Sequence, residues 1–283
     1  MKTIVDTYTM NNGVTIPCVG FGTWQTPNDQ VGYDAVKKAL EVGYRHIDTA
    51  AVYGNEESIG QAMVDSGLPR EAIFLTTKLW NDGHGYEATM EAFETSLKKL
   101  QTAYVDLYLI HWPNPLKFRD HWEEANAGSW KAMEELLEAG KIKAIGISNF
   151  RIHHIEALLK TAKVVPAVNQ IRLCPGDAPD DLINYCRDKG ILLEGYSPLG
   201  TGKIFGVSEI KSIAEKHERT VADVALKWSI QRGFLPLPKS VTPKWIESNA
   251  SFFDFELTEE DMMTINALDG VCGKATDPDT TKW

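Results

Sequence analysis

The stretch Val105–Ile110, VDLYLI, is a short run of apolar and β-favouring residues that ends directly at the polar side chain of His111. A run of this length and composition predicts a strand buried in a sheet. Similar runs recur along the chain, so that the sequence predicts eight strands in all, the other seven lying at residues 19–21, 44–47, 73–77, 144–147, 167–169, 191–195 and 234–237.

Amphipathic segments separate these runs. One of them carries apolar residues at helical spacing, and two later ones begin with a capping box, Thr220 to Asp223 and Thr258 to Asp261. Eight βα units in one chain of 283 residues favour a closed (β/α)8 barrel, the TIM barrel, and leave the open doubly wound sheet as the alternative. No linker divides the chain, so we expect one domain over residues 1–283.

A β-hairpin is predicted ahead of the barrel, at residues 7–16. β-Favouring residues lie on both sides of Asn12 and Gly13, and this pair supplies the turn with positive φ that short hairpins need. Because the hairpin precedes the first predicted barrel strand, we expect it to cap the bottom of the barrel.

The composition excludes several kinds of partner. The net charge is −10 and no block of basic residues is present, which argues against binding to nucleic acid. No apolar run approaches the ~18 residues of a membrane span, and the first residues do not resemble a signal peptide, so a cytoplasmic location without a membrane partner is expected. The four cysteines are too scattered to predict a disulfide or a structural zinc site.

Function in a barrel is expected where the strands end, at the C-terminal face. Polar residues follow almost every predicted strand there: Asp48 and Tyr53, Lys78, His111, Ser148 and Asn149, Gln170, Tyr196 and Ser197, Lys239 and Ser240. Taken singly, each has an ordinary structural interpretation, such as a turn cap or a solvated charge. Together they predict an active site.

Asp48, Tyr53, Lys78 and His111, together called the tetrad, form an acid–base set. A tyrosine with a pKa near 10 becomes a useful acid when a neighbouring ammonium such as Lys78 lowers its pKa toward neutrality. A carboxylate such as Asp48 keeps the lysine charged and oriented, and His111 can donate a hydrogen bond to a carbonyl oxygen. These four residues suit protonation of an oxygen that is becoming an alkoxide.

Three other interpretations of the sequence are disfavoured. His46 and Asp48 share a face of a strand as metal ligands do, but only His111 is available at the other strand ends, so we predict no metal. A Schiff base on Lys78 is disfavoured because Asp48 would hold the lysine charged. The glycines of residues 200–206 carry one residue too many for a dinucleotide fingerprint and are expected to form a flexible loop.

The chain resembles the aldo-keto reductase superfamily, most closely the bacterial members similar to 2,5-diketo-D-gluconate reductase and glyoxal reductase. The resemblance spans almost the whole chain and is carried by these segments in order: GFGTW (20–24), YRHIDTAAVYGNE (44–56), TTKLW (76–80), DLYLIHWP (106–113), GISNF (146–150), NQI (169–171), GYSPLG (195–200) and PKSVTP (238–243).

The resemblance implies NAD(P)H-dependent reduction of aldehydes, α-dicarbonyls or ketones. Tyr53 would donate the proton, Lys78 and Asp48 would tune it, and His111 would orient the carbonyl. It implies a monomer, and it leaves a non-catalytic nucleotide-binding regulatory subunit as the alternative. The implied cofactor contacts are Gly22, Thr23, Trp24, Asp48, Ser148, Asn149, Gln170, Tyr196, Ser197, Leu199, Lys239, Ser240, Val241, Thr242 and Asn249.

The segment after Lys239 and Ser240 departs from the family pattern. Members that prefer NADPH have an arginine and an acidic residue where this chain has Trp245 and Ser248. Arginine grips a phosphate with a planar fork, and tryptophan can only stack. We therefore expect NADPH as the cofactor, with NADH use permitted.

Aromatic residues at the strand ends are candidates to line the substrate pocket. Trp24, Trp80 and Trp112 join Tyr53 and His111 in that expectation, with Phe118 or Trp122 as further candidates. The polar tail at residues 277–283 ends in Trp283, which either folds back over the pocket or frays.

Overall fold

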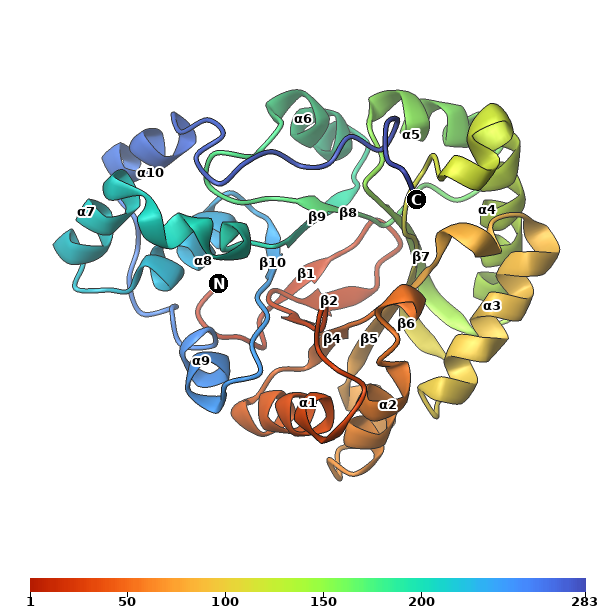
Figure 1. The fold of residues 1–283 in the computed structure, drawn as a ribbon, viewed down its shortest axis with the longest axis horizontal. Coiled ribbons are helices and arrows are strands. Elements are labelled where there is room, and N and C mark those ends of the chain that lie inside the picture. Colours follow the sequence, from red (N-terminus) through yellow and green to blue (C-terminus); the bar gives the residue numbers. More distant parts are fainter.

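Strands and helices alternate around a central barrel in the computed structural model, which describes residues 1–283 (Figure 1). Eight strands pair in parallel in chain order: β3 (Phe21–Gly22), β4 (His46–Asp48), β5 (Phe74–Leu79), β6 (Val105–Ile110), β7 (Ile142–Ser148), β8 (Val168–Arg172), β9 (Leu192–Tyr196) and β10 (Leu235–Leu237). Backbone hydrogen bonds from Gly20 to Pro236 (3.1 Å) and from Gly22 to Pro238 (3.0 Å) join the first strand to the last. These bonds close the barrel that the sequence predicted.

The helices surround the strands in Figure 1. They are α1 (Gln30–Val42), α2 (Glu56–Val64), α3 (Tyr86–Lys99), α4 (Trp122–Glu138), α5 (Ile152–Leu159), α6 (Asp180–Asp188), α7 (Ser208–Lys216), α8 (Val221–Gln231), α9 (Pro243–Ser248) and α10 (Glu259–Asn266). Both predicted capping boxes are present, with Thr220 opening α8 and Thr258 opening α10. No helix combines the length and the apolar character needed to cross a membrane.

All eight predicted strands are confirmed, and their bounds differ by a few residues. The second begins at His46 rather than at residue 44, because the Tyr44 N–H still bonds to the Ala39 carbonyl and completes the end of α1. β7 begins at Ile142, two residues before the predicted run. The exposed Lys143 interrupts the apolar pattern there without interrupting the strand.

Alternate residues of each strand face two different cores, as the pleat requires. In β6, Leu107 and Leu109 face the inside of the barrel, whereas Tyr108 and Ile110 pack into the large cluster beneath the helices. Both faces of the strand are therefore buried. This is why its sequence is almost continuously apolar rather than alternating.

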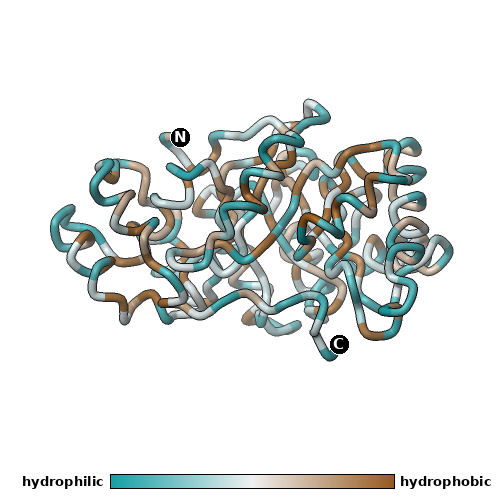
Figure 2. The backbone as a smooth tube through the Cα atoms, turned by 90° about the horizontal axis from the view of Figure 1, so that it is seen from above, coloured by the Kyte–Doolittle hydropathy of each residue, from teal (hydrophilic) through white to brown (hydrophobic).

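The hairpin of β1 (Thr7–Thr9) and β2 (Thr15–Pro17) closes the N-terminal end of the barrel. Met10 and Ile16 are buried in the inner core beside Leu107 and Leu109. Figure 2 shows the N- and C-termini at opposite faces of the molecule, so the hairpin and the C-terminal tail lie at opposite ends of the barrel. The predicted bottom cap is confirmed, and the other end is left for chemistry.

Candidate active site

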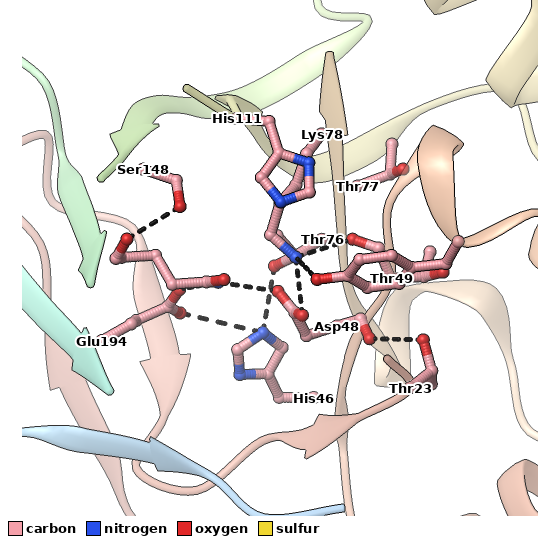
Figure 3. Close-up of polar contacts among 12 residues, drawn as sticks. Thr23, His46, Asp48, Thr49, Thr76, Thr77, Lys78, His111, Ser148 and Glu194 are labelled. Carbon is pink, nitrogen blue, oxygen red and sulfur yellow. Dashed lines mark hydrogen bonds and ion pairs between the residues drawn. The ribbon is translucent and has the colours of Figure 1, made fainter. Parts of the chain in front are cut away.

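The four predicted acid–base residues come together at the C-terminal mouth of the barrel. Asp48 ends β4, Lys78 lies near the end of β5, and His111 follows β6 directly. Tyr53 ends the short 3₁₀ helix η1 (Ala51–Tyr53), one turn after Asp48. Because neighbouring parallel strands end at the same edge, residues 30 or more positions apart in sequence become neighbours here (Figure 3).

Lys78 connects this group. Its side chain is fully buried, and its Nζ donates to Oδ1 of Asp48 at 2.7 Å and to the carbonyl oxygen of Thr49 at 2.9 Å. A third contact, at 3.4 Å, reaches Oη of Tyr53. An ammonium has three donors, so all of them are engaged and the position of Nζ is fixed.

The charges on this group follow from burial and pairing. Burial acts to lower the pKa of Lys78, but Asp48 and Tyr53 outweigh it, and the pKa lies above its ordinary value. The lysine is therefore a cation at neutral pH and not a free amine. This state is the opposite of what a Schiff-base lysine needs.

The expected lowering of the Tyr53 pKa is wrong for this structure. Burial raises the pKa of Tyr53, the Lys78 ammonium lowers it by less, and the Asp48 carboxylate raises it further, so the balance lies above the ordinary value. Lys78 acts in the expected direction, but the cost of burying a phenolate is larger. Tyr53 consequently holds its proton at neutral pH.

His111 lies beside Tyr53 as a neutral ring. The two ring centroids are 5.8 Å apart in an edge-on arrangement. Burial, together with the nearby Lys78 charge, lowers the pKa of His111 well below its ordinary value. Its Nδ1 is buried without a partner, so a hydrogen bond from the neutral ring to another molecule would come from Nε2.

Gln170, in β8, binds the second carboxylate oxygen of Asp48. Its Nε2 donates to Oδ2 of Asp48 at 2.8 Å and to Oε2 of Glu194 at 2.8 Å. Both amide hydrogens are thereby used, and no protein donor reaches its Oε1. An amide oxygen without a protein partner suits the N–H donors of a carboxamide.

Ser148, Asn149 and Tyr196 form a second hydrogen-bonded group at the ends of β7 and β9. The Ser148 hydroxyl donates to the Gln170 carbonyl (2.8 Å), and the Tyr196 hydroxyl donates to Oδ1 of Asn149 (2.8 Å). Asn149 and Ser197 have φ angles of 63° and 51°. Positive φ is uncommon at non-glycine residues and costs backbone energy.

The other residues predicted to contact a cofactor lie around the same mouth. Thr23 is buried and its hydroxyl donates to the Asp48 carbonyl at 2.8 Å. Ser197 and Leu199 connect β9 to the 3₁₀ segment η5 (Gly200–Gly206). Gly22 ends β3, Trp24 is exposed, and the remaining predicted contacts, Lys239, Ser240, Val241, Thr242 and Asn249, follow β10.

The segment after β10 forms an open rim. Lys239 is partly buried, and burial lowers its pKa. Trp245 stands half-exposed on α9, with Nζ of Lys244 5.0 Å from its ring centroid. Asn249, at the end of α9, is buried. The rim thus offers two lysines and an indole face where the family pattern has an arginine.

Two of the predicted pocket aromatics pack against His111. Trp80 meets it edge-on at 5.2 Å, and Trp112 stacks on it at 6.5 Å between centroids. Phe118 stacks instead on His84, and Trp122 packs on His153 and His154. The structure therefore brings Trp80 and Trp112, but neither of the two further candidates, into contact with His111.

The C-terminal tail folds back over this mouth. The Trp283 ring lies edge-on to Trp112 at 5.6 Å, and its carbonyl oxygen accepts from the Leu116 N–H at 3.0 Å. Asp279 accepts hydrogen bonds from His154 at 2.9 Å and from Asn114 at 2.9 Å. Of the two alternatives for Trp283, folding back is the one observed.

His153, His154 and Asp279 are close enough to suggest a metal site. However, the Arg151 N–H donates to Nδ1 of His154 at 3.1 Å, which places the proton of the neutral ring on Nε2. The Nε2–H group donates to Asp279 at 2.9 Å, so neither ring nitrogen of His154 has a lone pair free to bind a metal ion. The contacts of His153 and His154 with Asp279 hold the C-terminal tail against α5.

A cavity of about 720 Å³ lies away from Lys78, between α5, α6 and the segment that follows α10. Most of its charged lining groups form ion pairs with one another, as Arg232 does with Asp180 and Arg172 with Asp177. Its lining includes none of Asp48, Tyr53, Lys78 and His111. We therefore place the chemistry at the barrel mouth, where the buried charges meet.

Several supporting residues were not predicted. Nδ2 of the buried Asn55 donates to the carbonyls of Thr23 and Thr26, both at 2.9 Å, and its Oδ1 accepts from Thr49. Asn55 thereby ties the loop after β3 to the loop after β4. Its sequence signal, an asparagine just before a helix, is shared by many caps. Glu194 was missed because it lies inside an apolar run.

A closed (β/α)8 barrel with a buried acid, ammonium and phenol at its C-terminal mouth defines a barrel enzyme built for proton transfer to oxygen. A sequence model described as the Aldo/keto reductase family matches residues 18–270. The chain belongs to this family and is an oxidoreductase that acts on carbonyl groups.

Individual relatives agree over nearly the full length. Glyoxal reductase of Bacillus subtilis is 46% identical over 263 residues, which cover 93% of this chain and 92% of that protein. The crystal structure of an aldo/keto reductase from Brucella melitensis is 47% identical, with a TM-score of 0.89 over 95% of this chain and 100% of that one. An aldo-keto reductase of Bombyx mori in complex with NADP is 35% identical, with a TM-score of 0.85 over 94% of each chain.

Proposed function

We propose that this protein reduces small aldehydes and α-dicarbonyl compounds to alcohols, with Tyr53 as the proton donor. The observation that carries the proposal is the placement of one buried ammonium, Lys78, between the Asp48 carboxylate (2.7 Å) and the Tyr53 hydroxyl (3.4 Å). Carbonyl reduction requires a proton at the oxygen at the moment when negative charge develops there. Tyr53 keeps its proton at neutral pH, and Lys78 faces the phenolate that forms when the proton leaves.

The other residues orient the reaction. His111, as a neutral ring, would donate a hydrogen bond from Nε2 to the substrate oxygen and hold it near Tyr53. Asp48 keeps Lys78 charged and aimed. Trp80 and Trp112, which pack on His111, exclude water from the same region and strengthen these electrostatic interactions.

The residues at the mouth fit a nicotinamide cofactor, which supplies the hydride when bound. The unpartnered Oε1 of Gln170 is an acceptor for a carboxamide N–H, and Ser148 and Asn149 lie at the adjoining strand end. Tyr196 offers an aromatic ring, and Ser197 and Leu199 lie where the pyrophosphate would pass. The NADP complex of the Bombyx mori relative supports this class of cofactor.

We propose NADPH as the preferred cofactor, with appreciable use of NADH. Lys239 and Lys244 are point charges that attract a 2′-phosphate, but neither provides the bidentate grip of an arginine. Trp245 is half-exposed and free to stack on an adenine. The preference should therefore be weaker than an arginine at this position would give.

The α-dicarbonyl class rests on the relative named glyoxal reductase and on the aromatic pocket. We also propose that the chain acts as one domain over residues 1–283, as a cytoplasmic monomer. Size-exclusion chromatography with light scattering tests the monomer, since a stable mass of twice the chain would contradict it.

The direct test is the absorbance decay of NADPH and, in parallel, of NADH with methylglyoxal or phenylglyoxal. Turnover with both cofactors, faster with NADPH, is expected. Cofactor binding, detected by fluorescence quenching, without turnover of any carbonyl would support the alternative of a non-catalytic regulatory subunit.

A further inference from the structure

A second carboxyl group lies directly beneath the tetrad. Glu194 is the third residue of β9, its side chain is fully buried, and the strand register pairs it with Gln170 of β8 on one side and Leu235 of β10 on the other. Figure 3 shows Glu194 on the side of Asp48 away from Thr49, facing His46. No step assigned to the tetrad uses this residue.

Glu194 is connected to the tetrad through one amide. Nε2 of Gln170 donates one hydrogen to Glu194 and the other to Asp48, each at 2.8 Å. The other oxygen of Asp48 accepts from Lys78. A continuous chain of hydrogen bonds therefore runs from Glu194 through Gln170, Asp48 and Lys78 to Tyr53.

These bonds fix which way the Gln170 amide faces. With Nε2 between two carboxyl groups, Oε1 is the only uncommitted atom of the amide. A flipped amide would place its oxygen against the Asp48 carboxylate, an acceptor facing an acceptor in a buried site, and would lose both donor bonds of Nε2. Asp48 accepts one hydrogen of the Gln170 amide, and Glu194 accepts the other. The orientation of the amide therefore depends on both residues.

The charges around Glu194 are consistent with a neutral acid. Burial, together with the Asp48 charge, raises the pKa of Glu194 from 4.5 to about 8. The facing groups are Asp48, Lys78 and His46, and burial with the Lys78 charge lowers the pKa of His46 to about 3. At neutral pH this part of the barrel interior thus holds one ion pair, Asp48 with Lys78, beside a neutral Glu194 and a neutral His46.

We propose that Glu194 is a positioning residue for carbonyl reduction, which fixes the Gln170 amide and, through it, Asp48. The inference rests on the proposed function of the tetrad and adds a member to it. Glu194 acts through Gln170 and touches neither substrate nor cofactor. Its neutral form matters because a second negative charge beside Asp48 would oppose the negative charge that develops on the substrate oxygen.

The test compares Glu194→Gln with Glu194→Leu, using NADPH and methylglyoxal. Glutamine keeps an acceptor for Gln170 and resembles the neutral acid, whereas leucine leaves a buried N–H without a partner. We expect Glu194→Leu to lower kcat about ten-fold and to weaken NADPH binding, while the KM for methylglyoxal changes little. Glu194→Gln should remain close to wild type at neutral pH.

Glu56 provides a matched control. It is equally buried and accepts from the hydroxyls of Thr77 (2.7 Å) and Ser96 (3.2 Å), with no bond to the tetrad. Glu56→Leu should lower stability and leave kcat unchanged. If Glu194→Gln is as impaired as Glu194→Leu, or if both match wild type, the positioning role is wrong.

A pH series tests the inference even if Glu194→Leu fails to fold. The raised pKa means that the neutral form stabilises the folded protein fully below pH 4.5, and that this contribution is lost as the pH rises toward about 8. The urea midpoint of wild type should therefore fall over this range relative to that of Glu194→Gln. The variant should also retain kcat at a higher pH than wild type. Coincident kcat profiles for the two proteins would overturn the inference.

Tyr53→Phe, assayed alongside, separates the positioning role of Glu194 from the proposed role of Tyr53 as proton donor. Loss of turnover in Tyr53→Phe together with unaffected Glu194 variants would reject the positioning role and keep the proposed function. Normal turnover in Tyr53→Phe would reject the assignment of the proton donor itself.

Discussion

The inside of the barrel mouth and the rim around α9 handle charge in opposite ways. In the interior, Lys78 and Asp48 are nearly inaccessible to solvent, and every donor of the ammonium is bound. On the rim, Lys244 is exposed and Trp245 half-exposed, with Nζ of the lysine 5.0 Å from the centroid of the indole ring. The interior charges are fixed by their own contacts, whereas the rim side chains are open to solvent.

This difference indicates how the two regions respond to change. A buried ion pair that loses one member leaves an uncompensated charge in a medium of low dielectric, which is costly. An exposed charge that is removed is replaced by water at little cost. We therefore expect interior substitutions to abolish chemistry and rim substitutions to adjust the choice of cofactor.

The largest effect is expected from Lys78→Met. The change leaves Asp48 buried without its counter-ion and removes the cation facing Tyr53, so kcat should fall about 10³-fold and the free energy of unfolding by ~3–5 kcal/mol. Stopped-flow kinetics and urea unfolding measure the two effects.

Lys227→Met is the matched control for Lys78→Met. Lys227 is equally buried and pairs with Glu256 at 2.7 Å, on α8 and away from the mouth. The Lys227→Met variant should have a lower free energy of unfolding and an unchanged kcat. An equal loss of kcat in both variants would mean that Lys78 acts only through the fold.

A smaller effect is expected from His111→Ala. Loss of one hydrogen-bond donor to the substrate oxygen should lower kcat/KM for methylglyoxal about 10²-fold, with NADPH affinity nearly unchanged. His217→Ala is the control, since His217 pairs with Asp261 on the outer helices. An affinity for NADPH that falls with kcat/KM would place His111 in the cofactor site instead.

On the rim, Trp245→Arg should sharpen the preference for NADPH. One charge-assisted bidentate contact contributes ~1.5–3 kcal/mol, so the ratio of kcat/KM with NADPH to that with NADH should rise at least about ten-fold. Trp245→Ala separates the gain of arginine from the loss of tryptophan. A ratio that stays constant in Trp245→Arg would show that α9 does not contact the 2′-phosphate.

The smallest effect is expected from Trp283→Ala. The edge-on contact with Trp112 is worth ~0.5–1.5 kcal/mol, so the KM for phenylglyoxal should rise about two- to ten-fold with kcat unchanged. The dissociation constant for NADPH serves as the internal reference. If it changes as much as the KM does, the tail organises the whole mouth rather than the substrate pocket.

Much of the fold and the tetrad could be predicted because strand ends are visible in sequence. An apolar run followed by a polar residue locates Lys78 or His111 at the mouth without further information. The Tyr53 pKa could not be predicted, since its direction depends on whether burial or the Lys78 charge is larger. Sequence identifies both effects but measures neither.

Other contacts were hidden for equally physical reasons. One of the three partners of Lys78 is the Thr49 carbonyl, a backbone atom that no residue type reveals. Glu194 lies within a run that predicts a strand buried on both faces. An acidic residue in such a run was a usable signal, since a buried carboxyl group needs partners. The docking of the tail depends on Asp279, whose partners His154 and Asn114 are more than 120 positions away.

The central claim, that Tyr53 supplies the proton within a buried network anchored on Lys78, is tested most directly by Tyr53→Phe. The measurement is single-turnover oxidation of NADPH by methylglyoxal, with NADPH binding followed by fluorescence in the same samples. The account predicts unchanged binding and a rate lower by about 10²–10⁴-fold. Oxidation of NADPH at the wild-type rate by Tyr53→Phe would contradict it.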